Sequence, residues 1–536
     1  MLKISSEISD NIRTSRGPTA GAIAIATSRT TLTFTPAARW LATAAAMSAF
    51  FTSIFTGSMV NVAIPHVMGA FGIGQIQAQF LSTAFLGMNI TGLLASSWAI
   101  AKVGQRQTFG LVMLTFAGAS VLCFIAPTLE IMILGRILQG LAAGILQPLV
   151  MMVLFQVFPP ERRGLAMGMF SMGVTVALGL GPSMGGITID AFEWRAIFLI
   201  PVPVCILTII LGVLFLPAEE HKTQAGSFDW LGFVLANSFV LGWFTLLGNG
   251  QRWGWTSDNL MILSTFTLGC GIGFILSQQR PAGALLDLSL FRNGPFVLAL
   301  ACAFFFAFGN FATVYSFSIF GQFVQGFSPT VAGSMLLPGS IFAAMVLPLT
   351  GQASDRMPTP FVMIFGLIII AASTAMLIGA DANTLFWYVA ISLLIGRVGS
   401  AFANPAINTT AMSALTPQKM RDGAGITNLS LMFGGSTGIS VYVIALEYRT
   451  EFHAAHLGAT QTAANNTTVE MLRLVAQRLS EAGLAEATQQ NVAKSYLDSV
   501  ITAQATALSF QDGFLLLTLV SLGPLLPVAL LLRNRR

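Results

Sequence analysis

Fourteen long apolar runs dominate this sequence, and each is long enough to cross a bilayer. They lie at 41–65, 77–101, 108–126, 130–156, 164–189, 194–217, 228–248, 259–278, 295–322, 329–352, 359–379, 384–409, 422–447 and 509–532. A spanning helix needs about 20 apolar residues. Because backbone in lipid must satisfy its own hydrogen bonds, each run is expected to be helical. The sequence therefore predicts an all-α polytopic membrane protein with fourteen spans.

Composition excludes the main alternative, a large soluble protein with buried helices. Of 536 residues, 54% are hydrophobic and 9% are charged, whereas soluble chains carry about 25% charged residues. Lys and Arg gather in alternate connections, which places both termini in the cytoplasm. This bias accounts for the net charge of +5, so no nucleic-acid partner is expected.

Neither the two tails of the chain nor its cysteines indicate a cofactor. Residues 1–38 are rich in Ser, Thr and Ala, which predicts a disordered cytoplasmic tail rather than a cleaved signal. Residues 533–536 form a second cytoplasmic tail. The four cysteines stand singly in apolar runs, so neither a metal site nor a disulfide is expected.

The chain repeats itself. Gly135-Arg136 leads to Pro148 and a basic turn, and Gly396-Arg397 leads to Pro405 and another basic turn. Matched features predict two six-helix halves, 39–218 and 283–532, with two extra spans at 219–282 between them. Repeated halves around a site near the midplane are typical of alternating-access transporters.

Four motifs carry a specific resemblance. They are RILQGLAAG at 136–144, ALGLGPSMGGITIDAFEWRAIFLIPVPV at 177–204, SMVNVAIP at 58–65 and LLDLSLFRN at 285–293. In this order they resemble the major facilitator superfamily, and within it the fourteen-span drug:proton antiporter branch of the EmrB/QacA type. The resemblance implies a secondary active exporter of amphipathic small molecules in a bacterial inner membrane, which works by alternating access and is coupled to protons. It also implies a periplasmic adaptor protein and an outer-membrane channel as possible partners.

The chain departs from that family at positions that bear on proton coupling. Thr56 stands where the family's first-span motif has an aspartate, and Ala101-Lys102 replace an Asp-Arg pair after the second span. All 21 acidic residues fall in tails, loops or span ends, among them Glu447 and Asp512. Two alternatives therefore stay open: export of lipid-like compounds or metabolites without first-span proton coupling, and a transport-inactive sensor or scaffold.

An enzyme is not expected, because the sequence offers neither a nucleophile–base constellation nor a phosphate-binding loop.

The candidate site residues fall into four groups. Arg136 and Gln139 are candidates for coupling, since an intramembrane arginine usually marks a pathway or a paired site; the alternative is a purely structural arginine. Candidates for the substrate cavity are the polar residues Thr56, Asn61, Asn89, Gln147, Asn310, Tyr315, Arg397, Asn404 and Asn408.

Small residues at intervals of four characterise the fifth span and permit close helix packing. This antiporter-motif group is Gly173, Ala177, Gly181, Pro182, Gly185 and Gly186. The expected cytoplasmic gate is formed by two loops, and its residues are Lys102, Gly104, Arg106, Asp355 and Arg356.

Residues 448–508 form the longest polar connection. Apolar residues at helical spacing predict an amphipathic helix near 468–484, followed by a short second helix at 489–507. We expect a hairpin outside the membrane whose apolar face docks an adaptor protein; a solvated or disordered loop is the alternative.

Overall fold

The computed structural model describes residues 36–158, 163–216, 228–279, 285–416, 419–462 and 464–533. Most of the expected N-terminal tail and the last three residues of the chain lie outside these ranges. So do the side chains of Asp355 and Arg356, although the backbone there is helical.

The described chain is helical throughout. The membrane-spanning helices are α1 (Pro36–Phe71), α3 (Phe80–Val103), α4 (Gln105–Ile125), α5 (Leu129–Val157), α6 (Arg163–Ala191), α7 (Pro201–Phe215), α8 (Trp230–Trp253), α9 (Asp258–Ser277), α10 (Gly294–Phe323), α12 (Leu336–Arg356), α13 (Thr359–Ala375), α14 (Phe386–Ser413), α15 (Met420–Ala459) and α17 (Glu486–Leu522). Shorter elements are α2 (Gln75–Ala78), the 3₁₀ helices η2 (Trp194–Phe198) and η3 (Leu288–Arg292), α11 (Pro329–Ser334), α16 (Asn466–Glu481) and α18 (Leu525–Arg533).

These helices confirm the predicted spans. Within the described residues, 13 helices are long and apolar enough to cross a membrane, and α13 is a shorter apolar helix. Together they correspond one for one to the fourteen apolar runs. The last span is interrupted at Gly523-Pro524, between α17 and α18.

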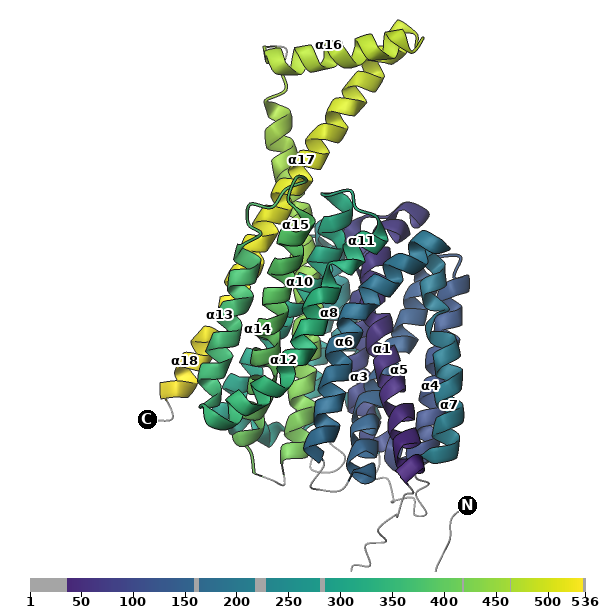
Figure 1. The fold of residues 1–536 in the computed structure, drawn as a ribbon, viewed down its shortest axis with the longest axis vertical. Helices are drawn as coiled ribbons and strands as arrows, with labels where there is room; N and C mark the ends of the chain where they lie inside the picture. Colours follow the sequence, from purple (N-terminus) through teal and green to yellow (C-terminus); the bar gives the residue numbers. More distant parts are fainter. Residues whose placement is uncertain are drawn as a thin grey trace, which may run out of the picture.

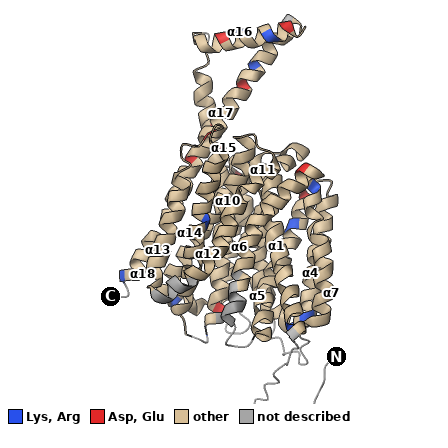
Figure 2. Ribbon diagram, in the orientation of Figure 1, with Lys and Arg blue, Asp and Glu red and all other residues tan. Residues whose placement is uncertain are grey.

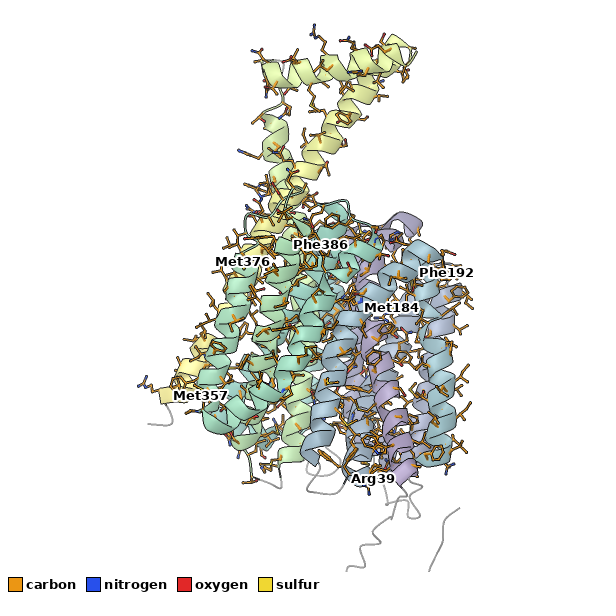
Figure 3. The ribbon with its side chains drawn as sticks, in the orientation of Figure 1. Arg39, Met184, Phe192, Met357, Met376 and Phe386 are labelled. Atoms are coloured by element: carbon orange, nitrogen blue, oxygen red, sulfur yellow. The ribbon has the colours of Figure 1, made fainter. Side chains whose placement is uncertain are left out.

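The spans form a bundle with two distinct ends (Figure 1). At one, the termini end, α1 begins and α18 finishes; from the other, the projection end, residues 448–508 extend away from the bundle. Charged residues gather at the two ends and on the projection, and most of the bundle between them is uncharged (Figure 2). Arg39 and Met357 mark the termini end, and Phe192 and Phe386 mark the projection end (Figure 3).

The helices pack in two groups. In the first, α1 packs on α6 and α7, and α5 packs on α3 and α4; in the second, α14 packs on α12 and α13, and α15 packs on α10 and α17. The groups meet where α6 contacts α11 and α12, and where α3 contacts α15. These contacts place the antiporter-motif helix, α6, at the seam between the groups.

The two extra spans differ in their surroundings. Helix α8 contacts both α3 and α15, so it covers one seam between the groups. Phe244 and Val240 of α8 pack with Ile90 of α3, and Trp243 Nε1 donates a hydrogen bond to Thr437 Oγ1 of α15 (3.2 Å). Helix α9 packs on α8 and exposes many large apolar side chains, as expected of a helix facing lipid.

The projection confirms one predicted helix and corrects another. Helix α16 matches the amphipathic helix expected near 468–484. The short second helix expected at 489–507 is wrong, because this segment belongs to α17, which continues without a break into the last span. Helix α15 likewise extends past the expected span end to Ala459. The projection is therefore a triangle of α16 and two helices that rise from the bundle (Figure 1).

Candidate functional site

Arg136 is completely buried and held by a network across three helices. Its Nε donates to the Leu81 carbonyl oxygen of α3 (2.7 Å), and its Nη1 donates to Gln139 Oε1 one turn along α5 (2.8 Å). Gln139 Nε2 in turn donates to Ser120 Oγ of α4 (2.7 Å). The guanidinium lies 4.3 Å from the centre of the Phe85 ring, at cation–π distance. The network therefore ties α3, α4 and α5 together around one charge.

Arg397 occupies the corresponding place in the second group but lacks such a network. It is 6% exposed, and no hydrogen bond between described residues involves any of its nitrogens, whereas Arg136 donates through Nε and Nη1; the Nη2 of each arginine is buried without a partner. No ion pair between described residues includes it. Instead the side chain lines a cavity of about 20 Å³ between α10, α13 and α14.

The residue one turn after each arginine explains part of this difference. The Gln139 side chain is long enough for its amide oxygen to accept a hydrogen bond from Arg136. The equivalent position after Arg397 holds the shorter side chain of Ser400. The Ser400 hydroxyl lies within hydrogen-bonding distance of Asn310 Oδ1 (3.2 Å) and of the Gly396 carbonyl oxygen (3.0 Å). The neighbouring helix α12 approaches Arg397 through Gly339, so no aromatic ring covers the guanidinium on that side.

Three expected cavity residues are buried and bonded. Thr56 donates to the Thr52 carbonyl oxygen of its own helix (2.7 Å). Asn61 Oδ1 accepts from Ser82 Oγ (2.7 Å), which joins α1 to α3. Tyr315 is also completely buried, and its hydroxyl oxygen lies 3.5 Å from Gln75 Nε2.

The other polar candidates are more open. Gln147, Asn310, Asn404 and Asn408 are half-buried, and Asn408 Nδ2 donates to Asn404 Oδ1 (3.0 Å). Asn89 is buried, and its Oδ1 has no partner among the described residues. Gln147 lies on α5 and the two asparagines on α14, each between its arginine and the termini end. Their role as substrate contacts stays a prediction.

The small residues of α6 pack against α1. A Cβ added at Gly181 would overlap Ser58 Oγ and lie 2.7 Å from the Phe55 carbonyl oxygen. One at Gly185 would lie 3.1 Å from the Met59 carbonyl oxygen, and one at Gly173 would lie 3.0 Å from Met47 Cε. Buried Ala177 accepts a hydrogen bond from Ser58 through its carbonyl oxygen (3.4 Å).

A second face of α6 packs against the other group. Ser183 Oγ donates to the Gly333 carbonyl oxygen of α11 (2.9 Å), next to Pro182. A Cβ added at Gly186 would overlap the Pro329 carbonyl oxygen, and one at Gly179 would overlap Ser340. The motif therefore supplies close contact on two sides.

Five hydrogen bonds between described residues join the α1–α7 group to the α10–α17 group. All lie in the half of the bundle nearer the projection; the pairs are Gln322 with the Val62 carbonyl, Ser183 with the Gly333 carbonyl, the Thr330 amide with Asp190, Ser436 with the Thr83 carbonyl and Gln75 with Tyr315. The groups are thus hydrogen-bonded to each other at the projection end.

The loop expected to form the first-half gate is a tight turn at the termini end. Gly104 has φ +94° between α3 and α4, a conformation that a residue with a side chain adopts only with strain. Lys102 Nζ lies 4.7 Å from the centre of the Trp98 ring, and Arg106 is half-buried. The expected partners Asp355 and Arg356 cannot be placed against this turn, because their side chains lie outside the described residues.

The LLDLSLFRN motif forms a clamp before α10. Asn293 Oδ1 accepts from the Phe296 amide (3.2 Å), and Asn293 Nδ2 donates to the Ala414 carbonyl oxygen (2.6 Å). Asp287 pairs with Lys419 Nζ (3.5 Å). Hydrogen bonds from Ser289 and the nearby lysine hold the pKa of this carboxyl below its usual value, so it stays charged at neutral pH.

The described residues contain no group of His, Cys, Asp and Glu side chains suited to a metal ion. Two acids close to the spans, Asp512 and Glu447, lie at the projection end. Asp512 accepts from Arg449 Nε (2.6 Å) and pairs with His453 Nε2 (2.7 Å). Glu447 is half-buried beside Gly74, and no ion pair between described residues includes it.

Sequence reasoning anticipated the Arg136–Gln139 pair but missed Leu81, Phe85 and Ser120. The pair follows from helical spacing, because residues three apart are neighbours on one face. The other three lie on different helices, and Ser120 and Phe85 resemble many other residues in apolar runs. No local signal distinguished them.

Comparisons with known proteins agree with this architecture. Residues 46–439 match the model of the Major Facilitator Superfamily. The multidrug export protein EmrB of Haemophilus influenzae is 26% identical over 91% of this chain and 94% of its own length. The multidrug resistance protein Stp of Mycobacterium tuberculosis is 28% identical over 72% of this chain and 71% of its own.

A solved structure shows a related fold. It is a bacterial homologue of the human lysosomal transporter Spinster in an inward-facing, unoccupied conformation, with 15% identity and a TM-score of 0.61 over 94% of this chain and 99% of that one. The family match covers most of the chain and coincides with the described bundle. The chain therefore belongs to the major facilitator superfamily and is a multi-pass membrane transporter rather than an enzyme.

Proposed function

We propose that this protein exports amphipathic small molecules from a bacterial cell by alternating access, coupled to protons. The observation that carries the proposal is the arrangement of contacts between the two helix groups, which share hydrogen bonds only toward the projection end among the described residues. Alternating access requires two bundles that rock about a site between them. The names of the similar proteins EmrB and Stp support drug-like cargo.

The proposed orientation in the membrane follows from charge. The positive-inside rule places both termini in the cytoplasm, so contact at the projection end closes the outer side. Half-buried Gln147, Asn404 and Asn408 lie toward the cytoplasmic end of their helices. A few polar groups in apolar surroundings suit an amphipathic compound.

Flux in inverted membrane vesicles tests export. We expect vesicles containing the protein to accumulate an amphipathic dye when their interior is acidified, and the accumulation to fall when the pH gradient is collapsed. Dye accumulation that is the same with and without the pH gradient would reject proton coupling. A failure to accumulate any compound in a broad panel would reject export.

Gly186→Ala tests the closing contact at the projection end. The added Cβ would overlap the Pro329 carbonyl oxygen and separate α6 from α11, so we expect the flux to fall at least tenfold. Gly118→Ala on α4 is the matched control, because a Cβ there has no neighbour within 4 Å. Equal flux in both variants would reject the contact as a gate.

Proton coupling requires a titratable group, and we propose Glu447 for this role. It is half-buried and lies at the seam near Gly74, whereas Asp512 is engaged by Arg449 and His453. Glu447→Gln should make the flux independent of the pH gradient. Thr56→Val should alter only affinity or substrate range, and loss of the pH dependence in the Thr56 variant would move the coupling site to the first span.

The projection is the proposed docking surface for a periplasmic adaptor protein. Leu472, Val475 and Leu479, the expected contact face of α16, are half-buried in the triangle. Apolar residues exposed instead are Val469, Leu474, Val492, Tyr496 and Val500. Of these, Val469 and Leu474 lie on α16, and Val492, Tyr496 and Val500 form a stripe on α17, so the proposed docking surface extends from α16 onto α17.

Replacing 455–505 by a Gly/Ser linker tests this docking role. The flux in inverted vesicles should persist while export from whole cells is lost. Equal whole-cell export by both proteins would contradict the docking role.

A further inference from the structure

We propose that Arg397 binds a small monovalent anion, of the size of chloride, in the cavity between α10, α13 and α14. The guanidinium stays charged in proteins. It is nevertheless 94% buried, it lines the cavity, and no hydrogen bond or ion pair between described residues involves any of its nitrogens. An uncompensated buried charge is costly, and a bound anion would neutralise it.

The lining of the cavity suits an anion. Hydrophobic Val314, Ile370 and Leu393 are interleaved with the polar side chains of Asn310, Thr313, Ser373, Thr374 and Ser400, and no carboxylate is among the lining residues. Asn310 directs its Oδ1 toward Ser400, which leaves its amide NH₂ group as a second donor for a ligand. A cation would be repelled by the arginine.

The size of the cavity favours a monatomic ion. About 20 Å³ is on the scale of a single water molecule. A carboxylate group of a transported compound shares the same chemistry, but would require the cavity to widen. The described part of the chain provides no competing anion, because its ion pairs lie at the two ends of the bundle or on the projection.

Thermal unfolding of the purified full-length protein tests the proposal independently of transport. Sodium isethionate, whose anion is too large for the cavity, is replaced stepwise by sodium chloride at constant ionic strength. We expect the midpoint of the wild type to rise by a few degrees and to saturate. Sodium benzoate is the second arm, and a larger rise with benzoate would identify an organic carboxylate as the anionic group.

Two variants make the outcome decisive. Arg397→Gln should remove the chloride response and, because it eliminates an unpartnered buried charge, should unfold at or above the wild-type midpoint in isethionate. Arg136→Gln is the matched control and should keep the chloride response. The proposal is overturned if chloride does not stabilise the wild type, or if Arg397→Gln responds to chloride as strongly as the wild type does.

Discussion

Each half of the molecule carries an arginine at the equivalent position of corresponding helices, Arg136 on α5 and Arg397 on α14. The surroundings of the two side chains differ. Arg136 reaches a backbone carbonyl, a glutamine and an aromatic ring. Arg397 lines a cavity, and no hydrogen bond between described residues involves it, while Nη2 is unpartnered in both arginines. The two helix groups thus share the charge but not its partners. We infer that the first arginine holds its helices together, and that the second is available to a ligand.

The largest expected effect is that of Arg136→Ala. The Leu81 carbonyl and Gln139 would lose a charged donor, which should cost about 3 kcal/mol of unfolding free energy, and transport should be lost. Arg136→Lys should be impaired as well, because lysine lacks the planar fork. Thermal unfolding and vesicle flux measure the two effects. Full transport by the alanine variant would show that the network is dispensable.

Gln139→Ala should have the next largest effect, about 2 kcal/mol, because it leaves Arg136 Nη1 without an acceptor in the interior. Gln147→Ala on the same helix is the control and should change stability little, since Gln147 is half-buried. Equal losses of stability in the two variants would contradict the role given to Gln139.

Ser400→Gln would give Arg397 the partner that Arg136 has. The longer side chain should fill the cavity, accept from the guanidinium and raise stability by about 1 kcal/mol. It should also remove any response to chloride. An unchanged chloride response in this variant, measured by thermal unfolding, would show that Ser400 does not control access to Arg397.

The smallest effect is expected for Ser120→Ala, which removes the acceptor of Gln139 Nε2. A neutral hydrogen bond contributes about 1 kcal/mol, so the unfolding midpoint should fall slightly and transport should persist. A loss as large as that of Arg136→Ala would mean that Ser120, rather than the arginine, anchors the network.

The sequence predicted the spans well because a bilayer requires long apolar helices. It misjudged the projection because 448–508 was treated as a separate hairpin. No proline occurs between Pro417 and Pro524, and no glycine between Gly483 and Gly513. The sequences of α15 and α17 therefore contain few residues that would end these helices at the membrane surface.

Prediction of the site was limited by its dependence on contacts between helices. The Gly-Arg repeat identified both arginines, and helical spacing identified Gln139. That Arg397 lacks such a partner could not be foreseen, because the space around it is set by Gly339 of α12 and by the lining from α10 and α13. Spacing along one helix carries no information about these neighbours.

Anomalous diffraction from crystals grown in sodium bromide tests the difference between the two arginines most directly. Bromide replaces chloride and its position can be located from its own scattering. We predict an anomalous peak in the cavity within hydrogen-bonding distance of the Arg397 guanidinium and none beside Arg136. A peak beside Arg136, or none beside Arg397 at saturating bromide, would contradict the assignment of Arg397 as the ligand-binding arginine.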